Sequence, residues 1–76
     1  MKNAYKFYYK APYSRARTEY VYVIATIEES AIVYFKQSGL FDYDYDYAEK
    51  PIGMISGDLF RANHEIGDIL GESAII

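Results

Sequence analysis

Apolar and polar residues alternate along two stretches of the N-terminal half. Residues 4–10 read AYKFYYK and place Tyr5, Phe7 and Tyr9 on one side of the alternation; residues 19–25 read EYVYVIA and alternate in the same way. A period of two is typical of a strand with one buried face. The intervening APYSRART contains a proline and small polar or basic residues, so it predicts a loop that closes a hairpin.

A helix is predicted after the second strand. Residues 26–29 have the form T-x-x-E, in which the threonine and glutamate side chains each bond a free backbone amide at the helix start. Gly39 favours a left-handed terminating conformation, so we expect the helix to end near Gln37. Four apolar residues share one face at helical spacing: Ile27, Ala31, Tyr34 and Phe35.

The next alternating stretch combines tyrosine with aspartate. Residues 41–47 read FDYDYDY, and we call them the acidic ribbon. Their period of two predicts a third strand, spanning residues 40–48, with the aromatic side chains on one side and the aspartates on the other. The Glu49-Lys50-Pro51 sequence breaks this strand.

The C-terminal third has weaker signals. Residues 52–55 (IGMI) form either a short fourth strand or an extended connector. Apolar residues from Leu59 to Leu70 recur at helical spacing and predict a second helix, with Gly71 as its stop. Residues 72–76 (ESAII) are then either a frayed tail or an apolar tail packed on the core.

These elements predict one α+β domain over residues 1–76, in the order strand, strand, helix, strand, optional strand, helix. We expect a small antiparallel sheet of three or four strands with two helices. A right-handed crossover makes the third strand parallel to the second and places the first strand between them. The helices would cover one face of the sheet and leave the other open, and the acidic ribbon would be an edge strand.

Composition narrows the class of protein. The chain has no cysteine, which excludes disulfides and thiolate metal sites, and it has no apolar segment of the ~20 residues that span a bilayer. Fourteen of its residues are aromatic, and ten of these are tyrosine. The net charge of −3 divides into five cations and no acid in residues 1–17, and eleven acids against three cations in residues 18–76. We expect a soluble, cytoplasmic protein that does not enter a membrane.

Enzymatic and metal-binding motifs are weak. The D-x-D-x-D spacing of the acidic ribbon matches the first positions of an EF-hand calcium loop. Two later positions do not match: Tyr47 replaces the required glycine, and Gly53 replaces the required bidentate glutamate. His64 has no second histidine with which to share a metal, and a surface or capping role is favoured over catalysis. The five glycines are scattered and form no phosphate loop. We expect no enzyme, no cofactor and no metal site.

Two surfaces remain as candidate binding sites. Aspartates two residues apart on a strand lie ~6.8 Å apart, so the acidic ribbon presents a row of negative charge. This row either guards an exposed sheet edge against pairing or binds a basic partner. The partner-binding residues on the second interpretation are Asp42, Tyr43, Asp44, Tyr45, Asp46, Tyr47 and Glu49.

The alternative surface is the basic, aromatic N-terminal hairpin. Cations interleaved with aromatic rings are typical of proteins that bind single-stranded nucleic acid, although the acidity of the rest of the chain opposes the approach of phosphate. Its candidate residues are Lys6, Tyr8, Lys10, Tyr13, Arg15 and Arg17.

In its size, order of elements and charge, the chain resembles the small inhibitors that phages and mobile elements encode, anti-CRISPR proteins among them. The shared features are a single cysteine-free α+β domain, overall acidity, an aromatic-rich sheet and a clustered acidic edge. The resemblance implies a non-enzymatic protein that acts in the cytoplasm of a bacterial host cell. It would bind the basic, nucleic-acid-binding surface of a host nuclease or surveillance complex without itself binding nucleic acid. A homodimer is also compatible with the tyrosine-rich sheet.

Overall fold

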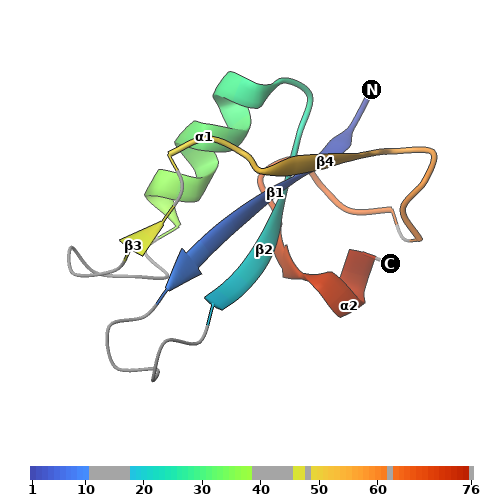
Figure 1. The fold of residues 1–76 in the computed structure, drawn as a ribbon. Helices are drawn as coiled ribbons and strands as arrows, with labels where there is room; N and C mark the ends of the chain where they lie inside the picture. Colours follow the sequence, from blue (N-terminus) through green and yellow to red (C-terminus); the bar gives the residue numbers. More distant parts are fainter. Residues whose placement is uncertain (11–17, 39–45, 48, 62, 76) are drawn as a thin grey trace.

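The computed structural model describes residues 1–10, 18–38, 46–47, 49–61 and 63–75. Their order of strands and helices gives the predicted α+β class (Figure 1). The elements are β1 (Asn3–Lys10), β2 (Thr18–Ala25), α1 (Glu28–Gln37), β3 (Asp46–Tyr47), β4 (Gly53–Ser56), β5 (Ile69–Gly71) and α2 (Glu72–Ile75).

Strands β1 and β2 form the centre of the sheet. They pair antiparallel over eight residues, from Asn3 opposite Ala25 to Lys10 opposite Thr18, so the predicted hairpin is confirmed and each strand begins one residue before its predicted start. Strands β3 and β4 both pair antiparallel with β1, and β5 pairs antiparallel with β2. The path through the sheet is β3-β1-β2-β5, with β4 beside β1.

Helix α1 covers one face of this pair of strands. The core on this face is built around Phe7 of β1 and Phe35 of α1, whose rings stack with centroids 4.3 Å apart and an interplanar angle of 14°. Both side chains are fully buried. The remaining buried members of this cluster are Tyr5, Val21, Val23, Ala25 and Ala31.

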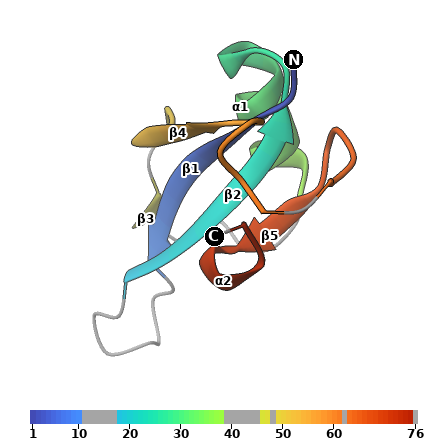
Figure 2. The same ribbon diagram turned by 90° about the vertical axis from the view of Figure 1, so that its right-hand side faces the viewer.

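The second face of the sheet also carries a core, which corrects the expectation of an open face. Ile75 of α2 is fully buried against the sheet together with Ala4, Tyr22 and Ile24. Figure 2 shows α2 on the other side of the strand pair from α1, with β5 beside β2. The Arg61 N–H donates to the Ile75 carbonyl oxygen at 2.9 Å. The C-terminal segment is therefore packed on the core, the second of the two predicted alternatives.

The predicted second helix over residues 59–70 is wrong. Turns and irregular backbone occupy this region, and it ends in β5. The chain follows the edge of β2: the Ile24 N–H donates to the Asp68 carbonyl oxygen at 3.0 Å, and the Gly67 N–H donates to the Ile24 carbonyl oxygen at 2.8 Å. Gly67 has a φ of 95°, which a right-handed helix does not allow. Gly71 closes β5 rather than a helix.

The start of α1 differs from its prediction, while its end agrees. Ile27 is the N-cap residue and no side chain caps the helix, so the T-x-x-E capping box does not form. Ile27 is also 52% exposed, whereas Ala31 and Phe35 are buried as predicted. The Ser38 hydroxyl donates to the Phe35 carbonyl oxygen at 2.7 Å. In the described parts of the chain, no helix is long and apolar enough to cross a lipid bilayer.

The stacked pair of phenylalanines predicts a large effect of core truncation. Phe35→Ala should lower the free energy of unfolding by about 3–5 kcal/mol, because it removes a fully buried ring and leaves a cavity. That loss approaches the whole stability of a domain of this size, roughly 4–11 kcal/mol, so Phe35→Leu, at about 1–2 kcal/mol, provides a measurable intermediate. Urea denaturation followed by circular dichroism measures both. Val33→Ala, on the exposed side of α1, is the matched control and should change stability by less than about 0.5 kcal/mol.

Candidate functional site

The described part of the acidic ribbon lies on the edge of the sheet. Strand β3 pairs antiparallel with β1, with Tyr47 opposite Tyr9 and Asp46 opposite Lys10. The predicted edge strand beside the first strand is thus confirmed for residues 46–47. Glu49 follows on an exposed turn. The other predicted partner-binding residues, Asp42, Tyr43, Asp44 and Tyr45, lie outside the described residues.

The register of β3 brings the acidic and basic parts of the chain together. Residues opposite each other on antiparallel strands share a face of the sheet, so the Asp46 position falls on the same face as Lys10, and the Tyr47 position on the face of Tyr9. Tyr9 packs against the core cluster under α1. The aspartate position therefore lies on the face away from α1, where the cationic positions of β1 lie. The two oppositely charged parts of the sequence meet at one edge of the sheet.

The basic, aromatic surface is partly described. On the face away from α1, the Lys6 Nζ lies 4.5 Å from the centroid of the Tyr20 ring and 5.9 Å from that of Tyr22, which is cation–π distance. Tyr8 lies opposite Tyr20 in the register. Tyr20 is 41% exposed, while Tyr22 is buried. We call Lys6, Tyr8 and Tyr20 the cationic tyrosine face.

Three residues predicted for this surface, Tyr13, Arg15 and Arg17, lie outside the described residues. Tyr20 was missed as a candidate because the prediction considered only the first strand and the loop. The signal was present in the alternation of the second strand, which puts Tyr20 and Tyr22 on one face. The register of the hairpin was needed to place Tyr20 beside Lys6.

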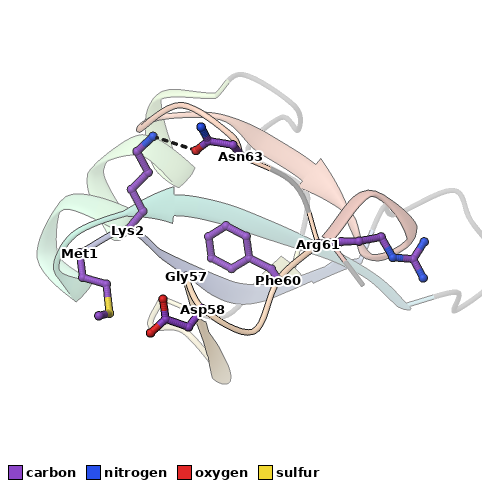
Figure 3. Close-up of a pocket in the computed structure, with 7 residues that line it drawn as sticks. All are labelled: Met1, Lys2, Gly57, Asp58, Phe60, Arg61 and Asn63. Atoms are coloured by element: carbon purple, nitrogen blue, oxygen red, sulfur yellow. Dashed lines mark hydrogen bonds between the residues drawn. The ribbon is translucent and has the colours of Figure 1, made fainter.

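A shallow pocket lies between the N-terminus and the turn after β4 (Figure 3). Its volume is about 360 Å³, and its lining residues are Met1, Lys2, Gly57, Asp58, Phe60, Arg61 and Asn63. In Figure 3 the Lys2 and Asn63 side chains point toward each other, and Arg61 points away from them. No sequence motif marked this pocket, because its two walls are more than fifty residues apart in the chain.

The polar groups of this pocket hold the fold together. The Lys2 Nζ donates to the His64 carbonyl oxygen at 2.9 Å and to Asn63 Oδ1 at 3.5 Å. At Gly57, a β-carbon would lie 2.3 Å from the Lys2 carbonyl oxygen, so only glycine fits. Asp58 is the one carboxylate in the lining. The arrangement ties the N-terminus to Gly57, Asn63 and His64.

His64 does not lie on a helix, contrary to its predicted place. Its Nε2 is 3.3 Å from the Ala74 carbonyl oxygen, a distance at which a protonated Nε2 donates a hydrogen bond. The nearby turn is closed by the Glu65 N–H, which donates to Asp68 Oδ2 at 3.1 Å. Among the residues that the structure describes, no group of three histidine or acidic side chains could hold a metal ion.

No family model, curated protein or solved structure matches this chain. Its function is therefore argued from the charge and exposure of its surfaces.

The close approach at Gly57 predicts a position-specific effect of adding a methyl group. Gly57→Ala should destabilise the protein by about 1–3 kcal/mol, because the new β-carbon meets a backbone carbonyl that cannot move without shifting the N-terminal segment. Gly71→Ala is the matched control, since nothing lies within 4 Å of its added β-carbon. Thermal and urea unfolding of the two variants would test this, and equal stability of both would contradict the close contact.

Proposed function

We propose that this protein is a non-enzymatic protein-binding inhibitor that presents the acidic ribbon to a basic, nucleic-acid-binding surface of a host nuclease or surveillance complex. It would act as anti-CRISPR proteins do, by stoichiometric binding in the cytoplasm of a bacterial cell. The observation that supports this proposal is the place of β3 on the edge of the sheet, paired with β1 in a register that puts tyrosine and aspartate positions on opposite faces.

The physical basis is charge and contact area. Carboxylates opposite arginine or lysine form short, charge-assisted hydrogen bonds, and tyrosine adds rigid contact area with a polar tip. A strand edge holds such residues at fixed spacing because the sheet beneath it is rigid. The neighbouring Lys10 position sets a limit, because opposite charges at paired positions of a sheet partly offset each other.

The proposal predicts that charge on the ribbon governs partner binding. The protein would be used to capture partners from lysates of bacteria that contain CRISPR complexes, with identification by mass spectrometry and titration of the purified complex. The triple variant Asp42→Asn, Asp44→Asn, Asp46→Asn should weaken binding about 10- to 100-fold, because each exposed charge pair is worth up to about 1 kcal/mol. Its binding should also depend less on salt.

A matched control removes the same number of charges elsewhere. Glu28, Glu29 and Glu65 are exposed acids outside the ribbon, and their replacement by glutamine should leave affinity within about threefold. Circular dichroism would confirm that both triple variants are folded. If the two variants lose affinity equally, or if neither does, the acidic ribbon is not the binding edge.

A second candidate function is the binding of single-stranded nucleic acid by the cationic tyrosine face. The contact between Lys6 and the half-exposed Tyr20 ring favours it, because exposed aromatic rings stack on bases while nearby cations contact phosphate. The acidic position of β3, Asp46, lies beside β1 on the edge away from β2, and it weakens this candidate through repulsion of phosphate.

Fluorescence anisotropy with labelled oligo(dT) and oligo(U) at low salt separates the two candidates. Nucleic-acid binding predicts an affinity that falls steeply as salt rises. Tyr20→Ala should then weaken binding by about 1–3 kcal/mol per stacked base, whereas the exposed Val33→Ala should not. Absence of binding at low salt would remove this candidate and leave the protein-binding proposal in place.

A further inference from the structure

Strand β4 forms an uncharged part of the sheet edge that it shares with β3. It pairs with β1 from Asn3 opposite Ser56 to Lys6 opposite Gly53. Within the described part of the chain, no strand pairs with its other side. An unpaired strand edge presents backbone N–H and C=O groups that can accept another strand.

The side chains of this edge favour pairing rather than preventing it. Residues 52–56 read IGMIS and contain neither a charged residue nor a proline, two of the features that protect an edge from pairing. Ile52 and Met54 are 51% and 55% exposed. Both line a shallow groove of about 380 Å³ between β4 and the start of α1, where Tyr5, Pro51 and Glu28 also contribute. β4 differs in this from β3, whose two residues include Asp46.

We propose that β4 pairs antiparallel with β4 of a second copy of this chain, with the two-fold axis at Met54. Met54 lies opposite Tyr5, so the two Met54 side chains would meet on the face that carries α1. Their flexible thioethers can adapt to each other and to the two grooves. The two sheets would join into one, with both α1 helices on the same face.

Charge complementarity selects a second copy as the partner. Lys50 precedes Met54 by four residues and Asp58 follows it by four, and both are exposed. Antiparallel pairing about Met54 brings Lys50 of each copy to the end at which Asp58 of the other copy lies. A two-fold interface uses one surface patch twice, so a single edge with opposite charges at its two ends is complementary to itself. An unrelated strand would have to supply both charges in this order.

Other charges near the edge bear on the strength of this dimer. Glu49 adjoins Lys50, and Glu28 lines the groove, so each copy also brings acids toward the interface. A four-residue strand buries little area, which places the dimer among weak, concentration-dependent assemblies. The pairing of β4 uses none of the acidic-ribbon residues, although β3 lies on the same edge of β1. Loss of the dimer and loss of inhibitor binding are therefore measured with separate variants.

Sedimentation equilibrium between about 5 and 500 μM tests the proposal, because a weak dimer should appear across this range. The wild-type protein should shift from monomer toward dimer. Met54→Lys should remain monomeric, since it places like charges together at the two-fold axis. The matched control is Ile66→Lys, which adds the same charge at a side chain that is 48% exposed and lies before β5, away from β4; it should dimerise as the wild type does.

A charge exchange tests the register. Lys50→Glu and Asp58→Lys should each weaken the dimer several-fold, and the double variant should recover wild-type association because the complementary ends are restored with opposite sign. Glu49 is present in all four proteins, so the double-mutant cycle over them isolates the coupling between positions 50 and 58. A wild-type protein that stays monomeric, a dimer that Met54→Lys leaves intact, or a double variant without recovery would each overturn the proposal. Circular dichroism of every variant would show whether a variant that no longer dimerises is still folded.

Discussion

The antiparallel pairing of β1 with β2 is the interaction on which the rest of the fold depends. Helix α1 packs on one face of this pair and the C-terminal segment on the other, while β3 and β4 extend one edge and β5 the other. None of these additions is stable alone: α1 has ten residues, below the length at which isolated helices persist, and β3 has two. The register of β1 against β2 therefore determines which of their side chains contact the other helices and strands.

The parts of the fold that could be predicted are those that local pattern encodes. Strands β1 and β2 were predicted correctly from the alternation of apolar residues, and α1 from the spacing of Ala31 and Phe35. Each of these elements buries one face, so its apolar residues recur in the sequence with the period of a strand or a helix. The segment from Leu59 to Leu70 has helical spacing without being a helix. Its structure is decided by hydrogen bonds to Ile24, more than forty residues away, and no local pattern records them.

The same distinction applies to the candidate surfaces. The edge position of the acidic ribbon followed from the order of elements, and the structure confirms it for Asp46 and Tyr47. The contact of Lys6 with Tyr20 required the register of the hairpin, and the tie from Lys2 to the His64 carbonyl joins residues 62 apart in the chain. Composition indicated that cations and aromatic rings would lie near one another; it did not indicate which ring each cation would meet.

The burial of Ile75 has a consequence for how the chain is made. During synthesis the two central strands leave the ribosome before α2, and Tyr22 and Ile24 lack the cover that Ile75 gives them until α2 follows. For that interval the nascent chain exposes an apolar sheet face, the kind of surface on which chains aggregate or recruit chaperones. The C-terminal segment thus covers apolar surface of the central strands as well as completing the core, and ribosome stalling before residue 75 should be more harmful than its distance from the central strands suggests.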